Sequence, residues 1–316
     1  MARTDTPAPT GRSTAPGTSS GATGASAART DDAAEFVYAL PGSPGGGRPG
    51  THGSRAKGPG LEFSAHGRLM DHPDPRRLDL RASLRSVPRE WLVRVNRQRG
   101  AVTLQAVVDV SASMHFGTSG GKLGVVRDFL VALGRSAFRG GDRVGLATFD
   151  DRARETPWLP PRAGRGTGYL MAAELDGLAS GSARRGGLEG LAACAARTPG
   201  EAALVFVVSD FHFPLAGVGA VLERFAATAV VPLVVHDPAE LEPPAEDGWL
   251  SVVDAESGRR RSLWLRESTR RRWREGVAAR REAIDAAFVA HDVHPFHVTG
   301  RFDAEALSRH FMEKVG

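Results

Sequence analysis

The chain has 316 residues, of which 41% are hydrophobic and 24% charged, a balance typical of soluble globular proteins. This length allows one large domain or two small ones. The single cysteine, Cys194, excludes an intrachain disulfide, which suits a reducing compartment, and we expect a cytoplasmic protein. No apolar run approaches the roughly 20 residues that cross a bilayer, so no integral membrane segment is expected.

The net charge of +5 comes largely from arginines near the C-terminus, at 259–261 and 270–272. Such clusters occur on surfaces that bind nucleic acid or anionic lipid. Glu267, Glu275 and Glu282 are interspersed among them, as in ion pairs along an exposed helix. We favour the solvated helix face and expect no nucleic-acid partner.

Composition divides the chain into three parts. Residues 1–34 have almost no large apolar side chains and no apolar stretch of a secretory signal, so we expect a disordered N-terminal segment. Residues 35–100 form a second segment, in which the Gly/Pro-rich stretch 42–60 predicts an irregular loop. Residues 101–316 carry the alternating patterns of a folded domain with a C-terminal helical extension.

The predicted elements alternate between strands and helices. Strands are expected over residues 92–95, 102–109, 143–149, 152–158 (as an edge strand), 202–209, 230–236, 250–254 and 293–298. Helices are expected over residues 122–138, 169–179, 188–196, 215–227, 265–291 and 303–315. This alternation predicts an α/β fold with a mainly parallel sheet flanked by helices, in which ligands bind at the carboxyl ends of the strands.

Polar side chains follow two of these buried strands. Asp109, Ser111 and Ser113 form an Asp-x-Ser-x-Ser turn after the first strand of the domain, and Asp210 follows the strand at 202–209. A carboxylate and two hydroxyls are hard oxygen donors that suit Mg²⁺ or Mn²⁺. Asp210 is placed to ligate the metal directly or to bind one of its waters. The competing interpretation is a helix N-cap, in which the same side chains only satisfy backbone amides.

The segment 107–114, Val-Val-Asp-Val-Ser-Ala-Ser-Met, resembles the first metal-site motif of von Willebrand factor A domains. The resemblance implies their doubly wound sheet and a metal-ion-dependent adhesion site (MIDAS), whose open coordination position takes an acidic group from a protein partner. The family's next motif supplies a threonine in a Gly-Thr-x-Leu turn. The matching turn here, 185–188, has no hydroxyl; Thr167, one helix earlier, is a possible substitute, and Ser182 is another nearby hydroxyl.

The flanking segments resemble the bacterial domain-of-unknown-function 58 family. Upstream, residues 52–63 are similar to one motif, and 71–80 to a Gly-Asp-Asp-x-Arg-x-Ile-Asp-Trp block, with Leu80 in place of the tryptophan. Downstream, 236–240 matches the family's Asp-Pro-x-Glu feature and 248–258 its Asp-x-Glu-x-Gly feature. The resemblance covers residues from about 50 to the C-terminus.

Members of this family often accompany MoxR-type AAA+ ATPases, and an MxaS-type branch accompanies methanol dehydrogenase maturation. The resemblance therefore implies a non-enzymatic adaptor that assists assembly or maturation of another protein. One alternative is a metal-free scaffold with a degenerate site, acting through the arginine-rich helix or the N-terminal segment. The other is an Asp109-dependent phosphohydrolase, which is disfavoured because Ser111 stands where a second aspartate is usual and no P-loop is present.

Histidines provide a further metal-binding hypothesis. The C-terminal histidine cluster, His291, His294 and His297, is a possible zinc or copper site, or an incidental grouping, which we favour because Pro295 breaks any helix there. His115 and His212 each follow one of the loops of the predicted metal site, where they border the partner-binding face or are ordinary loop residues.

Overall fold

The computed structural model describes residues 34–40, 49–58, 62–117, 121–155, 157–178, 184–200, 202–225, 228–253 and 258–315. The predicted disorder of residues 1–34 lies outside these ranges except at Ala34, and so does Ser182. The chain divides after Ala33, and every element below belongs to the unit from Ala34 onward.

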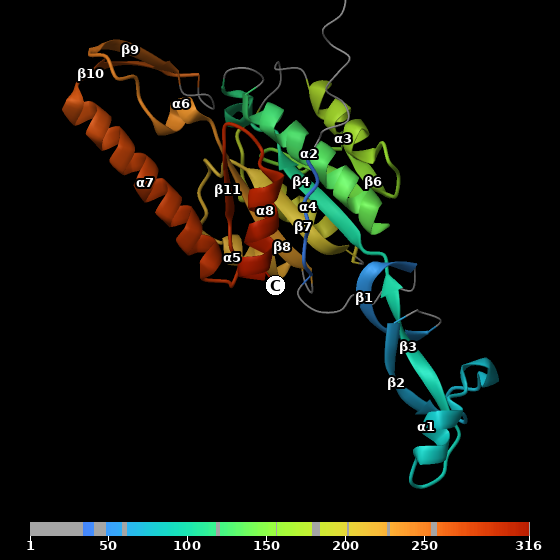
Figure 1. Cartoon of the computed structure of the whole chain (residues 1–316). Helices are drawn as coiled ribbons and strands as arrows, with labels where there is room; N and C mark the ends of the chain where they lie inside the picture. The colour runs from blue at the N-terminus through green and yellow to red at the C-terminus, as the bar shows by residue number, and fades with distance from the viewer. Residues whose placement is uncertain are drawn as a thin grey trace, which may run out of the picture. The chain divides into compact units, whose positions relative to one another are not determined.

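A six-stranded sheet has the strand order β11-β8-β7-β4-β5-β6 (Figure 1). Its strands are β4 (Thr103–Asp109), β5 (Arg143–Phe149), β6 (Leu159–Arg162), β7 (Ala202–Ser209), β8 (Ala229–His236) and β11 (Phe296–Thr299). All neighbours pair in parallel except β5 and β6, which are antiparallel. The predicted α/β fold with a mainly parallel sheet is confirmed.

Helices cover both faces of this sheet (Figure 1). One face carries α2 (Gly121–Gly140), α3 (Thr167–Asp176) and α8 (Ala304–His310), which is continued by the π-helical turn η3 (Phe311–Val315). The other carries α4 (Leu188–Arg197), α5 (Val218–Glu223) and α7 (Glu267–Val289). Side chains alternate along β4, so Ala106 and Val108 join the first apolar cluster and Val107 the second. Burial on both faces explains why this strand is apolar almost throughout.

A second, antiparallel sheet has the order β1-β3-β2. It consists of β1 (Pro49–Gly58), β2 (Glu62–Arg68) and β3 (Leu92–Gly100), with η1 (Pro75–Arg77) and α1 (Leu80–Arg85) between β2 and β3. The irregular loop predicted over 42–60 is therefore wrong for 49–58; residues 42–48 and 59–60 lie outside the described ranges. Backbone pairing with β3 forms β1, and this pairing does not depend on the side-chain pattern that a Gly/Pro-rich segment lacks.

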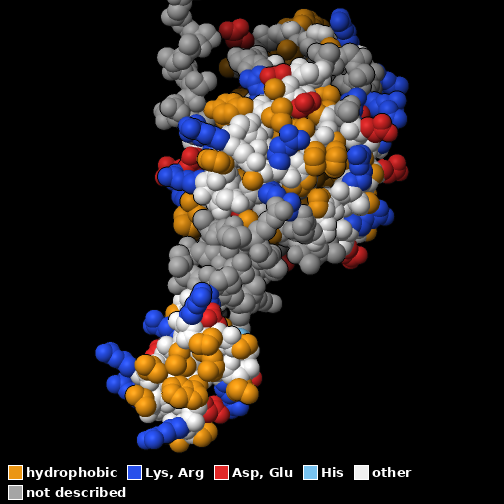
Figure 2. Space-filling view, turned by 90° about the vertical axis from the view of Figure 1, so that its right-hand side faces the viewer, with side chains coloured by type: hydrophobic (Ala, Val, Ile, Leu, Met, Phe, Trp, Pro, Cys, Tyr) orange, Lys and Arg blue, Asp and Glu red, His pale blue; other side chains and the backbone are white. Residues whose placement is uncertain are grey.

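Exposed apolar side chains gather on the part of the chain that carries β2 and α1, with arginines around them (Figure 2). They are Phe63, Met70, Leu80, Leu84, Val87 and Trp91. No other described segment covers these side chains.

A two-stranded hairpin precedes α7. Its strands β9 (Gly248–Val253) and β10 (Arg260–Leu265) are antiparallel, and the cross-strand pair Trp249–Trp264 stacks edge to face at 5.3 Å between ring centroids. Short helices also follow two strands of the main sheet: η2 (Ala112–His115) after β4 and α6 (Pro238–Leu241) after β8. None of the described helices is both long and apolar enough to cross a membrane.

Three sequence expectations need correction. The edge strand lies at β6 rather than at 152–158, because a turn in which the Asp150 amide donates to the Arg152 carbonyl interrupts the chain after β5. The prolines of β6 are tolerated because an edge strand leaves one row of backbone positions unpaired. Among the described residues, the helix expected over 215–227 is limited to α5, and the strand β10 was not predicted because its arginines resemble those of the following helix.

The segment 34–40 packs into the main domain, although nothing in its composition indicated this. The Phe36 ring lies 6.0–6.2 Å from the rings of Phe129, Phe206 and Phe302, and its amide donates to Ser136 Oγ at 2.9 Å. Phe36 thus bridges α2, β7 and the loop before α8.

We expect Phe36→Ala to lower the free energy of unfolding by about 3–5 kcal/mol, because truncation leaves a cavity among three aromatic rings. The neighbouring Val37 is 71% exposed, so Val37→Ala serves as the control and should change stability by no more than about 0.5 kcal/mol. Urea unfolding measures both. Equal effects of the two substitutions would show that residues 34–40 do not belong to the core.

Candidate metal centre

The site lies where the strand order of the main sheet reverses direction. From β4 the chain first goes to β5 on one side and later returns to β7 on the other. Val108 pairs with Val208 in the parallel β4–β7 register, so the ends of both strands lie side by side. Asp109, Ser209 and Asp210 are therefore neighbours at the carboxyl edge of the sheet, the usual place for a ligand in this fold.

The carboxylate of Asp109 is fully buried and held from two sides. Its Oδ2 accepts a hydrogen bond from Ser209 Oγ at 2.6 Å, and its Oδ1 accepts from the amide of Ser111 at 2.8 Å. Ser111 Oγ lies 3.2 Å from Ser113 Oγ, and both side chains are buried. The three residues of the Asp-x-Ser-x-Ser turn thus present their oxygens together.

Burial, followed by the negative charge of Asp210, raises the pKa of Asp109 to about 7. Hydrogen bonds from Ser209 and Ser111 oppose this rise but do not reverse it. A carboxylate with this pKa is only partly ionised at neutral pH, and a cation bound beside it would favour the ionised form. The donor set around Asp109 consists of hard oxygens, so the residues fit Mg²⁺ or Mn²⁺.

Asp210, unlike Asp109, is paired with a positively charged side chain. Lys122 Nζ donates to its Oδ2 at 2.6 Å, and the amide of His212 donates to its Oδ1 at 3.1 Å. Burial alone would raise the pKa of Asp210, but the charges of His212 and Lys122 and hydrogen bonds from Lys122 and Ser113 together lower it. Asp210 is therefore a stable carboxylate beside the Asp109 turn.

The loop that carries Asp210 and His212 is held in an unusual conformation. Phe211 has a φ of 51°, in the left-handed region that few bulky residues adopt. Arg280 of α7 donates to the carbonyl oxygens of both Phe211 and Phe213, the latter at 2.7 Å. The Phe211 ring also packs edge to face on Phe288 at 5.1 Å. These contacts stabilise the backbone that aims Asp210 at the site.

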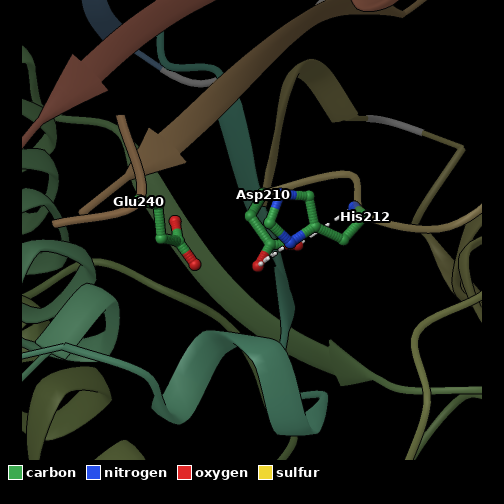
Figure 3. Close-up of side chains that lie close together, drawn as sticks. All are labelled: Asp210, His212 and Glu240. Carbon is green, nitrogen blue, oxygen red and sulfur yellow. Dashed lines mark hydrogen bonds and ion pairs between the residues drawn. The ribbon is translucent and has the colours of Figure 1, made fainter. Parts of the chain in front are cut away.

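A second group of donors lies beside the first. The ligand atoms of Asp210, His212 and Glu240 all lie within 4.8 Å of one another (Figure 3). In the close-up, His212 lies against Asp210, and Glu240 faces them from α6 across a gap. Lys122 Nζ also lies 2.6 Å from Glu240 Oε1, so the lysine ammonium already pairs with two members of this group.

Glu240 belongs to a capping box at the start of α6. Asp237 Oδ1 accepts from the Ala239 amide at 2.8 Å, and Glu240 Oε2 accepts from the Asp237 amide at 3.4 Å. A Cβ on Gly117 would lie 2.3 Å from Asp237 Oδ2, so this glycine lets the loop after η2 approach the cap. The Asp-Pro-x-Glu motif thus positions a carboxylate at the metal centre.

The turn 185–188 also reaches this centre. A Cβ on Gly186 would lie 3.3 Å from Asp109 Oδ2, and the Ala112 amide donates to the Arg184 carbonyl at 2.8 Å. The turn expected to stand in the place of the threonine motif therefore lies beside Asp109, but its glycine offers no hydroxyl.

The structure does not bring Thr167 to the other predicted ligands. Gly168, the next residue, packs against Leu130 and Val131 in the middle of α2. At about 1.5 Å per residue, that contact is roughly 13 Å along the helix from Lys122.

The C-terminal histidine cluster does not converge on one point. His297 Nε2 lies 2.7 Å from Asp285 Oδ1, and its Nδ1 lies 3.1 Å from His236 Nε2. His294 instead accepts a hydrogen bond from His310 on its carbonyl oxygen. Burial, followed by the charge of His297, lowers the pKa of His236 to about 4, so this ring is neutral at physiological pH.

Sequence reasoning missed Ser209 and Lys122 as members of the centre. Ser209 precedes Asp210 directly, and a polar residue at the end of a buried apolar strand was the available signal. Lys122 follows two glycines at the start of a helix, where the positive end of the helix dipole disfavours a cation. A lysine at this unfavourable position was the available signal.

Comparison with known families gives one match. The model of the family described as "Protein of unknown function DUF58" matches residues 73–283, more than half of the chain. The comparison with curated proteins gives no match.

Similar solved structures include an aerotolerance-related membrane protein from Bacteroides fragilis, 16% identical with a TM-score of 0.40, covering 68% of this chain and 98% of that one. A von Willebrand factor type A protein from Catenulispora acidiphila is 15% identical with a TM-score of 0.34, covering 45% and 35%. Proximal thread matrix protein 1 from the mussel byssus, with a zinc-occupied MIDAS motif, is 16% identical with a TM-score of 0.30, covering 43% and 36%. These TM-scores are too low for the similar structures to support a conclusion about this chain.

We expect Asp109→Asn to stabilise the metal-free protein. Because the pKa of Asp109 is about 7 when folded and near 4 when unfolded, wild-type stability in EDTA should fall as pH rises from about 4 to 7. The variant should lose this decline and gain about 1–3 kcal/mol at pH 8, measured by urea unfolding.

The control is Asp210→Asn, which removes a partner of buried Lys122 and should cost about 3 kcal/mol. If Asp109→Asn destabilised the metal-free protein to the same extent, Asp109 would not be an uncompensated carboxylate.

Proposed function

The chain belongs to the DUF58 family, whose function is unknown, and we propose that it is a non-enzymatic adaptor that captures a protein partner through a divalent metal ion. The ion is held by Asp109, Ser111 and Ser113, with Asp210 as a direct ligand or as the acceptor for a metal-bound water. The observation that carries this proposal is the buried Asp109 carboxylate, which lies beside two hydroxyls and whose pKa is raised by burial and by the charge of Asp210. Oxygen donors alone favour Mg²⁺ or Mn²⁺ over softer-ligand metals.

A groove beside this turn supports a protein partner. A cavity of about 780 Å³ is lined by Ala112, His115 and Phe116 on the side of the metal turn. Leu250 and Val252 of the β9–β10 hairpin line the other side. Because the same loop carries two of the metal ligands, we propose that the partner places a carboxylate on the metal and an adjacent apolar side chain in the groove.

Basic residues lie around the turn. His212 and His115 border the site, and Arg184 and Arg154 lie on the loops beside it, each paired with one carboxylate, Asp151 or Asp150. The family resemblance suggests a MoxR-type AAA+ ATPase as that partner, acting in the cytoplasm on the assembly or maturation of another protein, in the manner of MxaS-type members.

The alternative function is a scaffold without a metal. Gly186 favours it, because this residue lies against Asp109 where a threonine of the family motif would add a hydroxyl ligand. In a scaffold, binding would depend on protein surfaces alone. Chelation of divalent ions separates the two functions.

Isothermal titration tests the metal directly. We expect the wild-type protein to bind one equivalent of Mg²⁺ or Mn²⁺, and Asp109→Ala to abolish the heat, because the variant removes the one carboxylate of the Asp-x-Ser-x-Ser turn. Asp176→Ala, at an exposed carboxylate of α3, is the matched control and should titrate like the wild type. Absence of heat with both ions in the wild type, or full heat in Asp109→Ala, would refute the metal.

Binding of a purified MoxR-type ATPase to the surface-immobilised chain tests both the partner and the groove. We expect the ATPase to bind in the presence of Mg²⁺ and to dissociate when EDTA is added. Val253→Glu should weaken this binding at least tenfold, about 1.4 kcal/mol, because Val253 lines the groove and is 49% exposed. Val289→Glu, on α7 with 48% exposure, is the matched control.

Binding that persists in EDTA would support the scaffold instead. Equal losses in the two valine variants would exclude the groove, and no binding in any condition would exclude this ATPase as the partner.

A further inference from the structure

The side chain of Lys122 is fully buried at the start of α2. Its ammonium lies 2.6 Å from Asp210 Oδ2 and 2.6 Å from Glu240 Oε1. Removing an ammonium from water costs several kcal/mol, and the positive end of the helix dipole adds to this cost. The two carboxylates offset this cost, with a smaller contribution from the Phe116 ring, whose centroid lies 6.0 Å from the ammonium.

These contacts occupy a position that a metal ion could otherwise take. Asp210, His212 and Glu240 bring three ligand atoms within 4.8 Å of one another, a mixture of imidazole and carboxylate that suits zinc or cobalt. A metal ion bound there would lie beside Lys122 Nζ, which contacts both carboxylates, and the two positive charges would repel each other. The ammonium and a metal ion therefore exclude each other at this position.

The balance of charges also favours one exchangeable metal ion over two. Asp109, Asp210 and Glu240 contribute three formal negative charges, and Lys122 contributes one positive charge. One divalent ion near Asp109 balances the remainder, whereas a second ion beside Lys122 would leave these four groups with excess positive charge.

We propose that Lys122 is a built-in cation that closes the Asp210–His212–Glu240 position to metal ions and confines the exchangeable ion to the Asp109 turn. The second half of this proposal rests on the proposed function; the first half does not. Lys122 thereby makes the centre specific for an ion that prefers oxygen ligands, by denying access to the single histidine among the donors.

Cobalt titration of the full chain, followed by visible absorption, tests this role. We expect Lys122→Met to bind one more equivalent of Co²⁺ than the wild type, and Lys122→Met/His212→Ala to lose that extra equivalent. Lys122→Arg keeps the charge and should gain none. An unchanged stoichiometry in folded Lys122→Met, or a gain that does not need His212, would overturn the proposal.

A second measurement applies if Lys122→Met does not fold. Lys122→Gln keeps a hydrogen-bond donor for the two carboxylates, and its melting temperature should rise with Co²⁺ more than that of Lys122→Gln/His212→Ala; equal shifts would contradict the proposal. In the wild type itself, His212→Ala should leave Co²⁺ stoichiometry unchanged, and the loss of one equivalent would show that Lys122 does not exclude metal.

The outcomes also separate the two proposals. If the wild type binds no metal but Lys122→Met gains a His212-dependent equivalent, the adaptor mechanism fails and the role of Lys122 stands.

Discussion

The parallel pairing of β4 with β7 is the constraint on which the centre depends. It places the end of β4, with Asp109, directly beside Ser209 and Asp210, and it does so at the point where the strand order reverses. Two aspartates that are distant in sequence thus become buried neighbours. Every other feature of the centre serves to hold or neutralise these two carboxylates.

The two carboxylates have different hydrogen-bond donors around them. Asp210 accepts hydrogen bonds from the Lys122 ammonium and from the backbone amide of His212, whereas Asp109 accepts hydrogen bonds only from neutral donors. A fold selected only for stability would not bury an uncompensated acid among serines, because such a group opposes folding at neutral pH. This difference is the physical basis of the proposal that the Asp109 turn binds a metal ion rather than serving only as a helix cap.

The elements outside the central sheet position the surroundings of the centre. Arg280 of α7 holds the strained loop after β7, and Trp273 of the same helix donates to the Glu240 carbonyl at 2.8 Å. Trp273 also lines the groove between η2 and the β9–β10 hairpin. The arginine-rich helix, which composition alone related to solvent exposure or nucleic acid, thus makes structural contacts with both the centre and the groove.

The sequence by itself determined the strands that alternate with helices, the burial of β4 and β7, and the turn that presents Asp109, Ser111 and Ser113. Periodicity and turn chemistry are properties of neighbouring residues, so one sequence is enough to read them. Only the tertiary structure decided that Phe36 completes the core, that Thr167 of α3 lies beside the middle of α2 and away from the Asp109 turn, and that Lys122 pairs with Asp210. The last two residues are 88 positions apart, and their contact depends on the order of strands in the sheet, which no local pattern contains.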